Sequence, residues 1–489
     1  MKQNQEFNWY VKLSKTRFFT MDIVCWAWFF LKKRFNIGVF SEIITREKHA
    51  GVFYWSFDML NREGKKIISM IKKNKNFSSA IMKEFLIYKK DILSFSKNIE
   101  KKKLENLDKS KLDKLFNDFI ELYYKAIGFL TLSEPFEYIA EKIFEDKLSK
   151  KFKKEELTKY IAIIASPTQS SFIQEENIDL LKIAQKIKNK KLNKKEALKN
   201  KEINKLLDNH AKKYHWISDN YEQVVYLNKE HFLNNSFELI KKYKEPLQKI
   251  KEIKKVLNEN KANKKKLLNK IKMGEEFNIL VNNFDEFIHL RDLRKELNTK
   301  CFQYMEIFVK AYAKKFKMPL EDAYKLSSDE LITGKFDRTL AEIRDKNYLV
   351  FIKDYKKIEK EYFGEEAKRK AIEFGLVQKR ENELNGTVAS IGKGNVKGFV
   401  RILYSAKEIH LFKKDEILVV GKTDPSFVPA MERAAAIITD EGGLTCHAAI
   451  VSREMNKPCI IGTKLGTRTF KTGDYVEVDV KKGVIKIIK

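Results

Sequence analysis

The sequence predicts an α + α/β protein, with a large, mainly helical N-terminal region and a small α/β domain after it. Of the 19 glycines, eight lie in residues 1–385 and eleven in residues 386–489. Glycine is costly inside helices and common in turns, so the first region is expected to be helical and the second rich in short strands. Apolar residues recur at three- and four-residue steps within 104–152, whereas 475–480 alternates with a period of two. We predict a helical region at 1–380, a linker at 381–386 and the α/β domain at 387–489.

The first hundred residues are rich in aromatic side chains, which predicts a small aromatic core or the wall of an apolar pocket; we favour the core. Four tryptophans lie here: Trp9, Trp26, Trp28 and Trp55. The longest apolar run, 18–31, has fourteen residues including Asp22, fewer than the ~20 that a membrane-spanning helix needs. We therefore predict a buried element and no membrane partner. The four scattered cysteines match neither a disulfide framework nor a zinc site, which favours a reducing cytoplasm and no metal.

Two places in the helical region offer candidate substrate-binding residues. His210 and Trp216 occur close to a second histidine, which suits either a ligand pocket or packing at a helix end. Arg291 and Arg294 are three residues apart and so share one helix face. They are able to bind an anionic ligand through paired hydrogen bonds, or simply to form ion pairs with acids, which is the more ordinary outcome.

Charge is the other conspicuous property of the chain. The formal net charge of +31 raises the hypothesis of a nucleic-acid-associated protein. Lysine is spread over the whole sequence, however, and no nucleic-acid-binding motif is visible, so solvated lysine-rich helix faces are the better interpretation. One such stretch, 236–272, is predicted to form a projecting helical hairpin with its lysines in water.

A Gly-Gly turn near the end of the chain delivers one histidine to the start of a helix. The apolar run 434–438 predicts a buried strand, and Gly442 and Gly443 allow a tight reversal after it. Thr445 is a suitable N-cap for the helix that follows. His447 is then expected in the first turn, beside unpaired backbone N–H groups that favour an anion, phosphate in particular. The pattern predicts an anion site that contains a nucleophile.

The amino-acid identities in this segment are more specific than the spacing of its glycines and its histidine. Residues 442–454, GGLTCHAAIVSRE, followed by PCIIG at 458–462, resemble the phosphohistidine swivelling domain of PEP-utilising enzymes, a family that includes PEP synthase, pyruvate phosphate dikinase and rifampicin phosphotransferase. The segments TDP at 423–425, PAM at 429–431 and GTVAS at 386–390 resemble the same domain. Leu444 departs from the usual arginine or methionine, without affecting the histidine. The resemblance implies a three-layer β/β/α fold for 387–489.

The resemblance also implies a function. His447 would carry a phosphoryl group, with Thr445, Gly442 and Gly443 shaping its site. Family members load this histidine from ATP on an ATP-grasp domain, and several unload it on a C-terminal barrel. Neither is expected in this sequence, so we predict a phosphotransferase component that depends on an ATP-grasp kinase subunit, which would bind ATP and Mg²⁺. The acceptor would be a small molecule bound by the helical region. The alternatives are a non-catalytic binding or regulatory protein that keeps the swivelling fold, and a basic nucleic-acid-associated protein.

Overall fold

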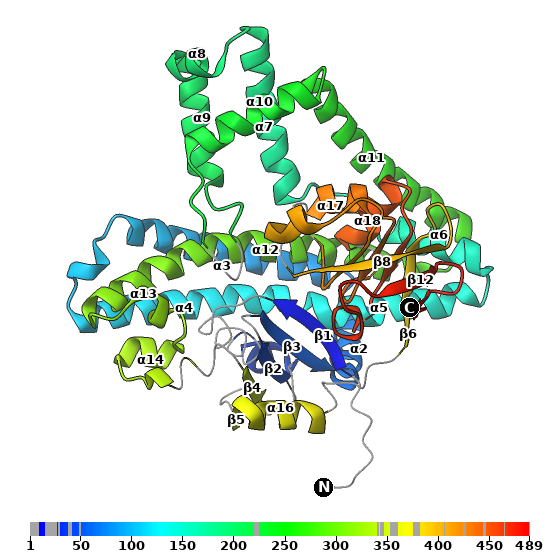
Figure 1. The fold of residues 1–489 in the computed structure, drawn as a ribbon, viewed down its shortest axis with the longest axis horizontal. Coiled ribbons are helices and arrows are strands. Elements are labelled where there is room, and N and C mark those ends of the chain that lie inside the picture. Colours follow the sequence, from blue (N-terminus) through cyan, green and yellow to red (C-terminus); the bar gives the residue numbers. More distant parts are fainter. Residues whose placement is uncertain are drawn as a thin grey trace.

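The computed structural model describes most of the chain. The residues described are 9–14, 27, 30–37, 42–47, 50–219, 224–339, 342, 347–352, 360–374, 382–404, 406–423, 427–443, 446–463 and 465–488. They form a body of long helices, a small antiparallel sheet, a helical unit that projects from the body and a C-terminal α/β domain (Figure 1). The prediction of a mainly helical region before an α/β domain is confirmed at this level.

The helices up to residue 373 have the following bounds: α2 (Phe57–Lys73), α3 (Phe77–Glu100), α4 (Lys109–Thr131), α5 (Ser133–Ser149), α6 (Lys154–Ile164), α7 (Phe172–Asn189), α8 (Lys194–Lys199), α9 (Lys201–Tyr214), α10 (Lys229–Lys242), α11 (Pro246–Ile271), α12 (Glu275–Lys315), α13 (Leu320–Ala323), α14 (Ser328–Thr333) and α16 (Gly364–Glu373). Helix α12 has 41 residues, which gives it a length of about 60 Å. It packs against α3, α4 and α5 and forms the axis of the helical body. Its inward residues, such as Phe284, Phe287 and Phe308, are fully buried because the flanking helices cover them.

An antiparallel sheet lies within the region that was predicted to be helical. Its strands are β1 (Trp9–Ser14), β2 (Glu42–Glu47), β3 (Ala50–Ser56), β4 (Asn347–Ile352) and β5 (Lys360–Phe363), in the order β1-β3-β2-β4-β5. The prediction of a mainly helical region did not include this sheet, in which β2 pairs with β4, a strand about three hundred positions away. Aromatic and β-branched residues suit such strands. Trp55 is the penultimate residue of β3 and is buried, so this aromatic residue belongs to the core, as favoured. Trp26 and Trp28 lie outside the described residues.

Helices α7 to α10 form a unit with its own small core, which projects at the top of Figure 1. The predicted hairpin at 236–272 is wrong. The chain turns at 243–245, and α11 then continues unbroken to Ile271. The sequence Asn258-Glu259-Asn260 does not break α11; the Asn260 side chain donates instead to the carbonyl of Pro167, at 2.9 Å. Helix α11 packs against α6 and α7.

The C-terminal domain contains a mixed sheet in the order β6-β13-β12-β8-β9-β10-β11-β7. Its elements are β6 (Glu383–Asn385), β7 (Thr387–Ser390), β8 (Val396–Leu403), β9 (Ile417–Val420), α17 (Val428–Arg433), β10 (Ala436–Thr439), α18 (His447–Glu454), β11 (Cys459–Ile461), α19 (Gly466–Thr469), β12 (Tyr475–Asp479) and β13 (Val484–Ile487). Strands β8 to β11 are parallel. Strand β6 pairs with β13, so the linker predicted at 381–386 belongs in part to this sheet. The finer three-layer arrangement stays a prediction.

Both faces of the central strands are buried, and each face belongs to a different apolar cluster. One face, with Val400, Val419 and Ile438, forms the core of the C-terminal domain. The other face, with Leu418 and Ile437, belongs to the apolar cluster that also contains the core of the helical body. The domain's own helix α18 contributes Ala448 and Ala449 to this cluster and contacts β10, so this face is continuous through α18 with the apolar core of the body.

Candidate functional site

The Gly-Gly turn follows β10 and leads directly into α18. Gly442 has φ +125°, a conformation that favours glycine, and a Cβ there would lie 2.6 Å from Cys446 Sγ. The amide of Cys446 donates to the carbonyl of Gly443 at 2.9 Å, which closes the turn. Cys446 is the residue before α18, and His447 is its first helical residue. The N-cap role predicted for Thr445 is therefore taken by Cys446, and Thr445 lies outside the described residues.

A buried aspartate, Asp440, anchors the beginning of the Gly-Gly turn. Asp440 is 4 % exposed, and its carboxylate accepts hydrogen bonds from the hydroxyls of Thr463 and Thr467 and from the Thr467 amide. Charge-assisted bonds of this kind are stronger than neutral ones. They fix the end of β10 against the segment that follows β11, so the turn has a firm base.

Thr423 orients the ring of His447. Its Oγ1 lies 2.8 Å from His447 Nδ1. Thr423 follows β9 and the Gly-Gly turn follows β10, and the carboxyl ends of adjacent parallel strands meet at one edge of a sheet. When Nδ1 carries the proton and donates it to Thr423, the lone pair of the neutral imidazole is on Nε2. That is the tautomer a nucleophilic Nε2 requires.

The histidine turn lies against helices α5 and α12 of the body. A Cβ placed on Gly443 would be 2.9 Å from Oε1 of Glu141, so this carboxyl group touches the turn. The positive charge of Arg291, on α12, acts on the thiol of Cys446, although burial still raises the pKa of that thiol. The structure thus brings Arg291, a sequence-predicted residue, to the segment that carries His447.

Two further charged groups lie where the histidine turn meets α5 and α12, a region called the seam below. Lys295 lies one helical turn after Arg291, and surrounding protein together with the charges of Arg291 and Lys422 lowers its pKa to about 8. Burial and the neighbouring Glu137 raise the pKa of Glu141 to about 7. Among the described residues, neither Lys295 nor Glu141 has a side-chain ion pair or hydrogen bond. Both charges are available for a ligand.

The two predicted arginines differ in position. Arg291 forms an ion pair with Glu137, and Arg294 forms one with Glu134, both on α5. The Arg294 side chain is 10 % exposed, and this pair joins the two helices, so it has a packing role. Arg291 is more exposed, at 27 %, and its charge also acts on the thiol of Cys446. Burial raises the pKa of Glu137 although Arg291 opposes the shift.

His210 and Trp216 are not brought to His447. Both are 4 % exposed and belong to the core of the α7–α10 unit. His210 Nε2 lies 2.9 Å from a carboxylate oxygen of Glu176, and the ring contacts Tyr214 and Phe232 with centroids 4.7 Å apart in each case. The indole N–H of Trp216 donates to the carbonyl of Lys213. Of the two alternatives left open for these residues, packing accounts for their burial and their contacts.

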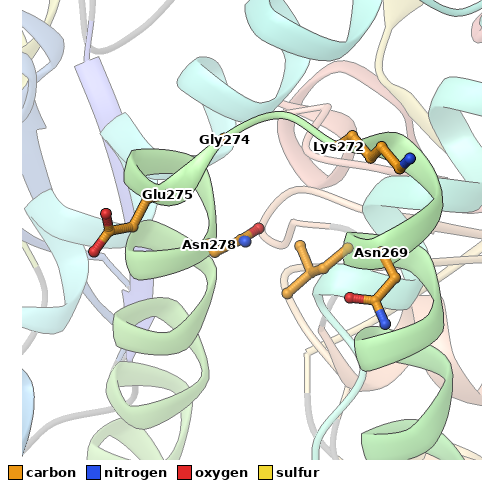
Figure 2. A pocket seen from close by; sticks show the side chains of 6 residues that line it. Asn269, Lys272, Gly274, Glu275 and Asn278 are labelled. Atoms are coloured by element: carbon orange, nitrogen blue, oxygen red, sulfur yellow. The ribbon is translucent and has the colours of Figure 1, made fainter.

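Other features do not add to the site. An open hollow of about 530 Å³ lies at the turn between α11 and α12. Figure 2 shows residues that line it, such as Asn269, Lys272 and Asn278. Arg453 donates to the carbonyl of Ala389 at 2.8 Å, and its positive charge also acts on the thiol of Cys446. Within the described part of the chain, His, Cys, Asp and Glu side chains nowhere gather in threes as metal ligands would. No helix in that part is both long and apolar enough to cross a membrane.

Sequence reasoning gave no role to four residues of this site: Thr423, Lys422, Glu141 and Lys295. For Thr423 and Lys422 a signal existed, since both follow the buried strand β9 beside the strand that ends at the turn. For Glu141 and Lys295 there was none, because only the packing of the domain on α5 and α12 makes them neighbours.

Residues 412–483 match the family described as PEP-utilising enzyme, mobile domain. The chain is 45% identical over 134 residues to the probable phosphoenolpyruvate synthase of Archaeoglobus fulgidus, covering 27% of this chain and 16% of that protein. It is 40% identical over 171 residues to the phosphoenolpyruvate synthase of Pyrococcus furiosus, covering 35% and 19%. The chain thus spans less than a fifth of the length of these relatives.

A solved structure, the holo-form of aconitase X from Thermococcus kodakaraensis, aligns at 18% identity with a TM-score of 0.18, covering 22% of this chain and all of that one. This score is too low to support a relationship. The phosphoenolpyruvate synthases and the family match agree with each other and with the Gly-Gly-histidine turn. Residues 412–483 are thus a mobile domain of the kind found in PEP-utilising enzymes, and the similarity to phosphoenolpyruvate synthases is limited to a minor part of the chain.

Proposed function

We propose that this protein is a phosphotransferase component in which His447 carries a phosphoryl group. The observation that carries the proposal is the position of His447: it is the first residue of α18, its Nδ1 is held by Thr423, and it lies in a domain homologous to that of PEP synthases. Backbone N–H groups at a helix start favour the added negative charge, by about 0.3–1 kcal/mol at an exposed site.

The donor in this proposal is ATP, bound with Mg²⁺ by a separate ATP-grasp protein. The acceptor is a small molecule bound at the seam between α18 and the helical body. Arg291 and Lys295 on α12 and Lys422 on the mobile domain supply positive charge there, which suits a phosphoryl group in transit. A swivel of the mobile domain between donor and acceptor would separate the two half-reactions.

The test is phosphorylation with γ-labelled ATP, with and without a co-encoded ATP-grasp protein. We expect acid-labile, base-stable label on the wild-type chain and none on His447→Ala. His410→Ala is the matched control, because His410 is an exposed histidine of the same domain, and it should label like the wild type. Absence of label under both conditions would favour a non-catalytic docking module, and label that persists in His447→Ala would contradict the carrier role.

A further inference from the structure

We infer that Glu141 is the general base of the transfer step and that the acceptor therefore carries a hydroxyl group. This inference rests on the proposed function, since it concerns the step that discharges His447. Its starting point is geometric: the carboxyl of Glu141 touches Gly443, four residues before the histidine, and the hydrogen bond from Cys446 to Gly443 makes those residues one tight turn.

The surroundings of Glu141 leave its carboxylate available. On its own helix it faces Glu137 and Glu145, which repel a negative charge. From α12 it faces Arg291, which is already paired with Glu137. In the described part of the chain, Glu141 accepts no hydrogen bond from a side chain, so it has capacity for a proton.

Its neighbour Glu137 gives a second, independent sign of a ligand at this place. Glu137 is only 8 % exposed, and its Oε1 is buried without a hydrogen-bond partner in the part of the chain that the structure describes. A buried carboxylate oxygen normally has a donor. A hydroxyl or amide donor on the acceptor molecule would satisfy it.

In the proposed step the phosphoryl group passes from a nitrogen of His447 to a hydroxyl oxygen of the acceptor. The hydroxyl oxygen of the acceptor forms a bond to phosphorus while the bond between phosphorus and the imidazole nitrogen of His447 breaks. The electron pair of that bond returns to the ring, and the hydroxyl proton moves to the Glu141 carboxylate. Arg291 and Lys295 neutralise the phosphoryl oxygens as the bond changes. An acceptor that is already an anion, such as a carboxylate, would not need this base.

The pKa of Glu141, about 7, suits this role because a general base works best with a pKa near the operating pH. The carboxylate is the active form, so discharge should become faster as pH rises through about 7. A free phosphohistidine shows the opposite tendency, since it is lost faster in acid. The direction of the pH profile thus separates catalysed from spontaneous loss.

The experiment follows labelled phospho-His447 after removal of ATP and of the loading protein, with phenol and glycerol as hydroxyl probes and acetate as the anionic probe. Wild type should transfer label to a hydroxyl probe, with a rate that rises between about pH 6 and 8. Glu141→Gln should lower that rate by about 10²–10⁴-fold and flatten the profile, while loading of His447 stays intact. Asp146→Asn, at an exposed acid of α5 that forms a surface ion pair with Lys150, should keep the wild-type profile within about twofold.

Three results would overturn the inference. The first is an unchanged rate and profile in Glu141→Gln, and the second is transfer to acetate but not to either hydroxyl probe. The third is a Glu141→Gln variant that discharges more slowly by the same factor at every pH, which is expected if Glu141 only helps the domains to dock. A wild-type chain that never becomes labelled would instead contradict the proposed function.

Discussion

The turn at His447 and the cluster around His210 contain the same kind of residue in opposite situations. His210 is surrounded on its own unit by Glu176, Tyr214 and Phe232, and packing accounts for its burial. His447 lies at a helix start and meets a seam between two parts of the molecule, with a threonine on one ring nitrogen. A histidine is thus marked for chemistry less by its neighbours in sequence than by whether the fold leaves space and charge beside it.

The largest expected effect comes from exchanging the two histidines for alanine. His447→Ala should abolish labelling while changing the free energy of unfolding by less than about 1 kcal/mol, because the ring is only partly buried. His210→Ala should lower that free energy by about 2–4 kcal/mol, through a cavity and an unpaired Glu176, and should leave labelling intact. Denaturant unfolding and the labelling assay measure both. If His210→Ala lost labelling while keeping the wild-type stability, His210 would have a role in phosphoryl transfer, which would contradict this prediction.

The next effect separates the two glycines of the turn. Gly442→Ala should lower the free energy of unfolding by about 2 kcal/mol or more and impair loading, because φ +125° and contact with Cys446 both oppose a side chain. In Gly443→Ala the new Cβ meets only the flexible end of Glu141, so stability should change by less than about 1 kcal/mol. Discharge of the loaded histidine should still slow down. Thermal unfolding and single-turnover discharge distinguish the two, and equal behaviour would contradict the proposed packing of the turn.

A smaller effect is expected at the residue that orients the ring. Thr423→Val keeps the shape of the side chain but removes the hydroxyl 2.8 Å from Nδ1, and should slow loading of His447 by about tenfold, the value of one hydrogen bond. Thr423→Ser keeps a hydroxyl and should recover most of the rate. Loading kinetics with both variants provide the check; identical rates for valine and serine would show that the hydroxyl does not matter.

The smallest effect concerns the His210 side of the comparison. Hydrogen bonds from Lys182, Lys213 and Tyr214 outweigh burial and lower the pKa of Asp179 to about 2. A depressed pKa stabilises the folded state above the ordinary carboxyl range, and this contribution is lost as pH falls towards 2. Asp179→Asn should therefore cost about 1 kcal/mol at pH 7 and almost nothing near pH 2. Urea unfolding across this range measures it, and a difference that grows in acid would be the wrong sign.

The sequence was most informative where local rules decide the structure. The helical character of most of 57–333, the strand before the turn and a helix after it that has His447 in its first turn all follow from periodicity and glycine placement, although the helix begins one residue later than predicted. The pairing of strands that are distant in the sequence was not predicted. Strands β2 and β4 pair only because the helices between them fold back, and no local sequence pattern indicates this. For the same reason Arg291 was a candidate from sequence and Glu141 was not. The arginine shows a helical spacing, whereas the glutamate acquires its neighbour Gly443 only through the docking of another domain.

Two adjacent residues of α12, Arg291 and Asp292, interact with two different parts of the molecule. Arg291 faces the mobile domain, whereas the next residue, Asp292, accepts a hydrogen bond from the Phe172 amide at the start of α7. Successive residues point about 100° apart on a helix, so adjacent positions of α12 interact with two separate parts of the protein. A substitution that rotates α12 about its own axis is therefore expected to disturb the α7–α10 unit and the histidine turn together.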